Sequence, residues 1–176
     1  MVTRTPWLER EFETVQPLET FPNLLERLRG TPARVEDRLR LAAPGTLAAR
    51  HGDSWSILET VGHLLQVESL WADRLDDFVT RRPELTPARF EAWRVGEAQF
   101  NHRAARDLCS AFRTARNHLV HRLERLDESV LQVVARHPRL DRPMRIMDLM
   151  LFIAEHDDHH MVTISERLGS ARPATP

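Results

Sequence analysis

Lysine is absent from this sequence, and cysteine occurs only once, at Cys109. A single cysteine excludes an intramolecular disulfide. Cys109 has no histidine beside it in the sequence, so the sequence does not favour a nucleophilic role for its thiol. The basic residues, all arginines, number 25 against 26 acidic residues, which gives a formal net charge of −1. Because this balance lacks the positive excess typical of nucleic-acid-binding proteins, we expect no nucleic-acid partner.

Long apolar segments are also missing. No apolar run approaches the roughly 20 residues that a membrane span requires. The N-terminus, MVTRTPWLERE, lacks the apolar segment of a signal peptide. We therefore expect a cytoplasmic protein with no membrane partner, and its 176 residues suffice for one domain with a substantial core.

The spacing of apolar residues predicts four helices and shows no strand pattern. The expected helices cover residues 22–41, 56–82, 104–126 and 145–168, and the first has a possible interruption at Gly30-Thr31-Pro32. The second begins with a capping-box pattern, Ser56-Ile57-Leu58-Glu59, and the fourth stops at Gly169. Four helices in one compact domain indicate an all-α fold, a four-helix bundle.

The segments between and beyond these helices have less regular patterns. Residues 1–20 read as an extended arm that packs its aromatic side chains on the body, and residues 170–176 as a loose tail. Residues 83–103 and 127–143 form long connections, each with room for one short helix. Long connections often line functional sites, so we expect residues 52–55 and 83–103 to shape the mouth of a pocket.

The stretch AEHDDHHMVTI, residues 154–164, places three histidines within six positions. On a helical wheel with Ile146 at zero, His156 and His160 fall near about −80° and −40°, one turn apart and partly facing the interior. His159 falls near about −140°, together with Phe152 and Glu155, and points more outward. Helical spacing therefore favours the pair His156 and His160 over any pair that contains His159.

Two imidazoles at positions i and i+4 can bind one metal ion, although they can equally form local hydrogen bonds on a solvated face. A metal site needs a third ligand from elsewhere, and His63 in the second helix is the candidate. The apolar stripe of that helix points about 140° away from His63. The side that carries His63 also carries Thr60, Val67 and Leu70, so the helix is expected to be covered on two sides, one of them facing a cleft.

Two carboxylates occupy positions where apolar residues are expected, Glu68 in the second helix and Asp157 in the fourth. A buried carboxylate needs partners or a shifted pKa. Each can pair with an arginine or an indole N–H. Alternatively, Asp157, or Glu59 one turn before His63, orients an imidazole that binds metal. His137 and His102 are expected on the surface or in the long loops, where they could line the mouth of a cleft.

Several of these segments resemble a known family. WSILETVGHLLQVE, residues 55–68, is similar to the second-helix signature of the DinB-like superfamily, and AEHDDHHMVTI to its last-helix signature. Three further segments, ERLRGTPARVE, RLDDF and HPRLDRPMRIMDL, resemble one DinB subgroup. The resemblance extends over nearly the whole chain, as far as Leu168.

This resemblance implies a four-helix bundle with up-down-down-up connectivity, which commonly forms a homodimer. It implies one divalent metal ion, zinc or nickel, bound by His63, His156 and His160, with His159 outside the ligand set. Because three imidazoles accept several ions, the choice of metal stays open. Three protein ligands also leave a coordination position open, as in catalytic sites.

The resemblance further implies a metal-dependent enzyme that acts on a small-molecule substrate. The reaction would be a hydrolysis or a thiol S-transfer with a low-molecular-weight thiol as co-substrate. Glu59, Asp157 and His159 are the nearest candidates for catalytic residues around the metal. The alternative is a non-catalytic stress or scaffold protein in which the ion is structural.

Overall fold

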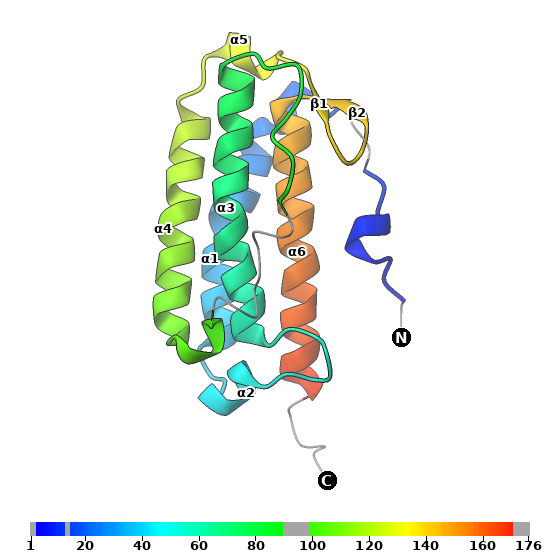
Figure 1. Ribbon diagram of the computed structural model, residues 1–176. Coiled ribbons are helices and arrows are strands. Elements are labelled where there is room, and N and C mark those ends of the chain that lie inside the picture. The colour runs from blue at the N-terminus through cyan, green and yellow to red at the C-terminus, as the bar shows by residue number, and fades with distance from the viewer. Residues whose placement is uncertain (1–2, 13–14, 90–98, 171–176) are drawn as a thin grey trace.

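The computed structural model describes residues 3–12, 15–89 and 99–170. Four long helices dominate it (Figure 1): α1 (Phe21–Leu39), α3 (Ile57–Val79), α4 (Ala105–Glu124) and α6 (Ile146–Ser170). They confirm the predicted four-helix bundle. The shorter elements are η1 (Trp7–Glu9), η2 (Leu18–Thr20), α2 (Pro44–Ala48), η4 (Phe100–His102), α5 (Glu128–Leu131), β1 (Ala135–His137) and β2 (Arg142–Met144).

The direction of the four helices confirms the up-down-down-up connectivity. In Figure 1, α1 and α6 run down the view, whereas α3 and α4 both run up it. Each long helix makes its main contacts with two others, so that α1 and α3 both pack between α4 and α6. Because α3 and α4 are parallel neighbours, the chain that joins them has to return along the length of the bundle.

Local sequence signals explain where α3 begins and why α1 continues. The Ser56 side chain accepts a hydrogen bond from the Glu59 N–H at 3.0 Å, and the Glu59 carboxylate accepts one from the Ser56 N–H at 2.8 Å. The expected interruption of α1 at Pro32 does not occur. Pro32 has no N–H for the carbonyl of Leu28 four residues earlier, and Nη1 of Arg116 donates to that carbonyl at 3.3 Å instead.

A small β-hairpin, β1 and β2, corrects the expectation that the chain has no strands. The two strands pair antiparallel, with Ala135 opposite Met144. The segment that follows α3 is hydrogen-bonded to β1. Arg136 N donates to Pro83 O at 2.8 Å, and Leu85 N donates to Arg136 O at 3.0 Å. Strands of three residues are too short to show a repeating alternation, which is why the sequence did not reveal them.

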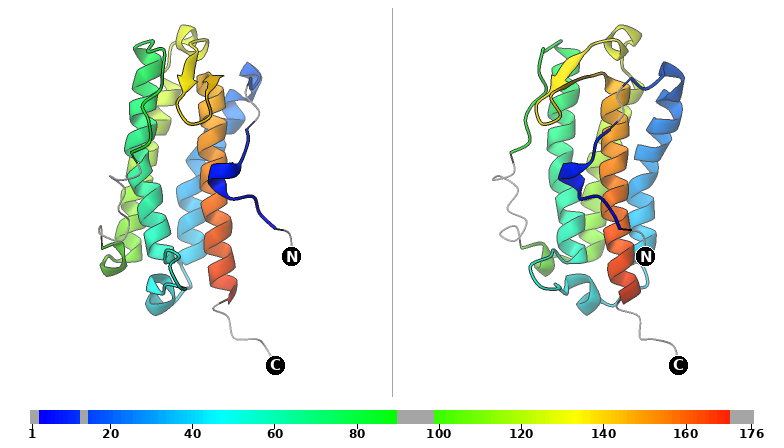
Figure 2. Two further views of the ribbon diagram at one scale, coloured as in Figure 1. Left: turned by 45° about the vertical axis from the view of Figure 1, so that its right-hand side comes forward. Right: turned by 90° about the vertical axis from the view of Figure 1, so that its right-hand side faces the viewer.

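The N-terminal segment lies against α6 (Figure 2). The rings of Trp7 and Phe12 each approach the ring of Phe152 with a centroid distance of 5.0 Å. Phe152 is only 3% exposed, so the expectation that it points outward with His159 is wrong. The arm covers this flank of α6, which a helical wheel of α6 alone treats as surface.

Parts of three expectations lie outside the described residues. These are residues 1–2 and 13–14 of the predicted arm, residues 90–98 of the connection between α3 and α4, and residues 171–176 of the predicted tail. Within the residues that are described, no helix is both long and apolar enough to cross a membrane.

Candidate metal centre and its cavity

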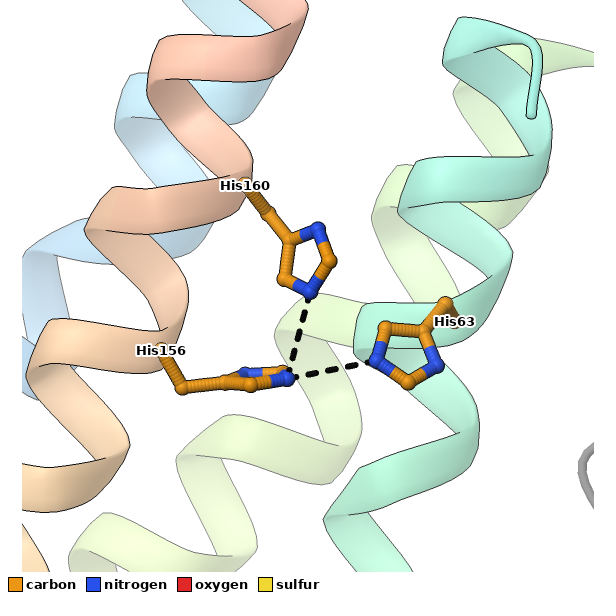
Figure 3. Close-up of side chains that lie close together, drawn as sticks. All are labelled: His63, His156 and His160. Carbon is orange, nitrogen blue, oxygen red and sulfur yellow. Dashed lines mark hydrogen bonds between the residues drawn. The ribbon is translucent and has the colours of Figure 1, made fainter. Parts of the chain in front are cut away.

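Three histidine rings converge between α3 and α6 (Figure 3). His63 comes from α3, and His156 and His160 come from successive turns of α6. Nε2 of His156 lies 3.2 Å from Nε2 of His63 and 3.2 Å from Nε2 of His160. One ring nitrogen from each residue falls within a set whose members are all within 4.8 Å of one another. The structure thus brings together the three histidines predicted as metal ligands.

Burial favours the neutral form of His63 and His160. His63 is 8% exposed and His156 is 4% exposed. Burial lowers the pKa of His63 to about 3, and the nearby His156 adds to the effect. Burial likewise lowers the pKa of His160 well below its ordinary value, with further contributions from His156 and His63. A neutral imidazole offers a free lone pair, which is the form that binds a metal ion.

The donor set and its spacing fit a divalent ion. Two nitrogens that bind zinc at about 2.0–2.1 Å in tetrahedral geometry lie about 3.3 Å apart. The two His156 distances of 3.2 Å match this separation. Since three imidazoles leave the fourth tetrahedral position free, the arrangement corresponds to an open site rather than to a closed structural one.

Tryptophan rings surround the three histidines. Trp55 lies 4.9 Å from His63, Trp7 lies 5.1 Å from His156, and Trp71 lies 5.6 Å from His156, as measured between ring centroids. These rings come from the α2–α3 connection, the N-terminal arm and α3. Close aromatic contacts restrict the rotation of the imidazoles and exclude water from their flanks.

A cavity of about 610 Å³ adjoins the three histidines. Its wall is mainly aromatic and aliphatic and consists of Trp7, Leu8, Trp55, His63, Val67, Leu70, Trp71, Arg74, Pro87, Ala88, His137, Pro138, Arg139, Phe152, His156 and His160. This volume is in the range of small-molecule binding sites. Residues from both segments expected at the pocket mouth, Trp55 and the pair Pro87 and Ala88, take part in the wall.

One face of α3 forms a long side of this cavity. His63, Val67, Leu70, Trp71 and Arg74 all line it, at the spacings of three and four residues that place side chains on one helical face. The opposite face of α3, with Val61 and Leu64, is buried in the bundle core. The helix is therefore covered on two sides, as its pattern indicated, and His63 lies on the side that faces the cavity.

The far end of the cavity contains His137, which was expected at the surface or in a long loop that could line a cleft mouth. Its side chain is 1% exposed, and its Nε2 lies 3.0 Å from Nη1 of Arg74. Burial and the charges of Arg74 and Arg139 lower the pKa of His137 to about 3. The β-hairpin carries His137 against α3, and strands this short leave no repeating pattern by which they could be predicted.

The two carboxylates at apolar positions share one arginine. Arg116 of α4 is fully buried and donates from Nη2 to Glu68 at 2.6 Å and from Nη1 to Asp157 at 2.5 Å. Burial raises the pKa of Asp157, but the charge and hydrogen bonds of Arg116, together with the neighbouring His156, jointly lower it to about 2. Burial and the charge of Asp157 raise the pKa of Glu68. The structure therefore confirms the simpler of the two expectations, in which the carboxylates pair with an arginine.

Of the three residues predicted around the metal, Asp157 is next to a ligand candidate, but its carboxylate turns toward Arg116. Its Oδ1 lies 3.9 Å from Nδ1 of His156, beyond hydrogen-bonding distance. Glu59 is engaged by the Arg50 guanidinium and the Ser56 N–H at the start of α3. The ring of His159 packs against that of Trp7, with 5.8 Å between centroids.

Comparisons with known proteins agree with this fold. The chain matches the model of the DinB superfamily over residues 8–164. Its fold is similar to that of YfiT from Bacillus subtilis, described as a probable metal-dependent hydrolase with an unusual four-helix bundle topology. The TM-score is 0.78 at 16% identity, over 92% of this chain and 93% of that one. No curated protein matches the sequence. Because the family match extends over most of its length, the chain belongs to the DinB superfamily.

Proposed function

We propose that this protein is a metal-dependent enzyme that uses His63, His156 and His160 to hold one divalent ion, zinc or nickel. The observation that carries the proposal is the convergence of three imidazoles on one wall of a cavity with room for a small molecule. A structural ion would need no such cavity. The description of YfiT as a probable hydrolase supports the same class of reaction.

The reaction is a hydrolysis or a thiol S-transfer on a small-molecule substrate. An ion in this position lowers the pKa of a bound water or thiol. The chain contributes the fixed orientation of its imidazoles, which the surrounding tryptophans hold, and an apolar wall that keeps bulk water from the reacting group. His159, which is partly buried beside His160 at a centroid distance of 5.4 Å, is the candidate for proton transfer.

Turnover assays on metal-loaded protein test this proposal. Para-nitrophenyl esters probe hydrolysis, and low-molecular-weight thiols with 1-chloro-2,4-dinitrobenzene probe S-transfer. We expect one of the two activities, its loss on chelation and its absence from a His63→Ala/His160→Ala variant. His118→Gln, an exposed change on α4, is the matched control and retains activity. Activity that survives chelation would contradict the mechanism.

The second candidate is a non-catalytic protein in which the ion fastens α3 to α6. The position of the three histidines across these two helices favours it. A large fall in melting temperature on chelation, with no turnover in either assay, would support this role. Homodimeric assembly and a cytoplasmic location belong to the proposal as well. Light scattering at several protein concentrations tests the dimer.

A further inference from the structure

The end of the cavity remote from the three histidines has an unusual set of polar groups. Arg74 and Arg139 both line it, together with His137. His63 and Arg74 are eleven residues apart on α3, which corresponds to about 16 Å along the helix axis. The hairpin that carries His137 lies near the end of the bundle where α3 finishes (Figure 1). The cavity therefore has two polar ends, separated by apolar and aromatic side chains.

Both guanidinium groups are held in place by uncharged partners. Nε of Arg74 donates to the carbonyl of Thr86 at 2.9 Å, and its Nη1 lies 3.0 Å from Nε2 of His137. Nη1 of Arg139 donates to the carbonyl of Leu8 at 3.0 Å. Each guanidinium also lies over an aromatic ring, Arg74 over Trp71 at 5.5 Å and Arg139 over Phe152 at 5.7 Å. The two side chains are thus preorganised before any ligand binds.

Positive charge at this end exceeds negative charge. Arg74 is 2% exposed, and burial lowers its pKa to about 10; Asp77 opposes this shift and the charge of Arg139 adds to it. The Asp77 carboxylate itself accepts hydrogen bonds from Arg82 and from the Thr86 N–H. In the part of the chain that the structure describes, neither Arg74 nor Arg139 forms a salt bridge.

Two buried donors at this wall also lack an acceptor. Among the described residues, neither Nη2 of Arg139 nor Nε1 of Trp71 has a hydrogen-bond partner, although both atoms are buried. Buried donors are nearly always paired in folded proteins. Two such donors beside an excess of positive charge indicate that the missing partner is an acceptor-rich, negatively charged group of a ligand.

We propose that Arg74 and Arg139 form an anion subsite that receives a carboxylate at one end of an elongated apolar substrate, whose other end reaches the three histidines. The subsite adds a substrate class to the proposed function. It rests on that function only for the statement that the end of the substrate at the three histidines is the end that reacts. It defines the substrate class as amphipathic acids with an apolar spacer. The aromatic wall between the two ends, with Trp71 and Phe152, accommodates that spacer.

Binding of a matched pair of probes to metal-stripped protein tests the subsite without the metal site. The probes are 5-phenylpentanoate and its neutral amide, 5-phenylpentanamide. Their binding is followed by the fluorescence of the cavity tryptophans Trp7, Trp55 and Trp71 and by calorimetry. We expect the acid to bind wild-type protein at least tenfold more tightly than the amide.

Three variants on the same segment test whether the preference for the acid depends on Arg139. Arg139→Gln should bring the acid-to-amide ratio close to one while leaving the affinity for the amide unchanged, and Arg139→Lys should restore part of the ratio. Arg136→Gln removes an equal charge from the hairpin, but from an exposed side chain that pairs with Asp141, and should keep the wild-type ratio. Urea unfolding verifies that each variant is folded.

The proposal is overturned if wild-type protein binds neither probe, if it binds acid and amide equally, or if Arg136→Gln loses as much preference as Arg139→Gln. A parallel zinc titration separates this result from the proposed function. An acid preference without zinc binding would leave the subsite standing and contradict the metal site. Zinc binding with turnover but no acid preference would support the proposed function and contradict the subsite.

Discussion

Two buried polar clusters lie side by side in this bundle, and adjacent residues of α6 belong to them. Asp157 joins Glu68 and Arg116 in the core, whereas His156 joins the other two histidines at the cavity wall. Both clusters link α3 to α6 through polar side chains in an apolar setting. They differ in the groups that converge, a cation with two carboxylates in the first cluster and three imidazole nitrogens beside a cavity in the second.

The cluster around Arg116 is satisfied internally. Its guanidinium donates to two carboxylates and to the carbonyl of Leu28, which Pro32 leaves without its helical partner. The three histidines instead bring one ring nitrogen each to within 4.8 Å of one another. A cluster whose charges are paired holds helices together, whereas imidazole nitrogens that converge beside a cavity form an arrangement able to bind a cation. Buried polarity alone does not distinguish structure from function, but the chemistry of the converging groups does.

The largest expected effect is on the satisfied cluster. Arg116→Met leaves the carboxylates of Glu68 and Asp157 without their shared cation, and we expect the free energy of unfolding to fall by about 3–5 kcal/mol. Arg113→Met, on the same helix, breaks only a half-exposed pair with Glu36 and should cost about 0–1 kcal/mol. Urea unfolding measures both, and equal losses would contradict the assigned role of Arg116.

Metal binding should stabilise the histidine cluster by a smaller amount. Zinc at a free concentration one hundred times its dissociation constant adds about 2.7 kcal/mol to the free energy of unfolding if it binds only the native state. This increment should vanish in His160→Ala and persist in His118→Gln. Unfolding curves with zinc and with a chelator measure it. An unchanged increment in His160→Ala would remove that residue from the ligand set.

Acid should weaken the metal-free histidine cluster. The pKa of His63 is about 3 in the folded protein, whereas an unfolded histidine titrates near about 6.5. The folded state thus binds fewer protons, so the stability that His63 contributes is complete above the unfolded pKa and is lost as the pH falls from about 6.5 toward 3. At pH 5 the loss amounts to about 2 kcal/mol.

Urea unfolding at pH 7.5 and pH 5 in the presence of a chelator checks this sign and size. His63→Gln should lose about 2 kcal/mol less than wild type between the two pH values, because it lacks one of the groups that titrate. His118→Gln should lose as much as wild type. A His63→Gln variant with the full wild-type acid sensitivity would show that the His63 ring is not buried in its neutral form.

The smallest effect concerns Glu59, which the sequence suggested as an orienting group for the metal. Its carboxylate caps α3 and binds Arg50, so Glu59→Ala should cost about 1 kcal/mol of stability and leave the zinc dissociation constant unchanged. Glu59→Gln, which can keep the cap, should cost less. A tenfold weaker affinity for zinc in both variants would instead give Glu59 a role at the metal site.

Local signals were reliable where a single helix contains all the information. The capping box at Ser56 marks the start of α3, and the spacing of His156 and His160 placed both rings on one side of α6. Pro32 suggested an interruption of α1 that does not occur, because a guanidinium from α4 binds the carbonyl that Pro32 leaves without a donor. Phe152 was expected on the outward side of α6, but it is covered by the N-terminal arm. The residues of that arm that contact Phe152 lie 140 or more residues away in the chain.

The sequence by itself determined four helices, the neighbouring pair of imidazoles on the last helix and two carboxylates that required buried partners. These follow from a fixed rotation per residue and from the cost of burying charge, both of which act within short stretches of chain. Only the tertiary structure decided that His63 faces that pair, that Arg116 supplies the cation, and that Arg74, His137 and Arg139 meet at the other end of the cavity. The rotation of one helix relative to another depends on packing between distant segments, and no local spacing encodes it.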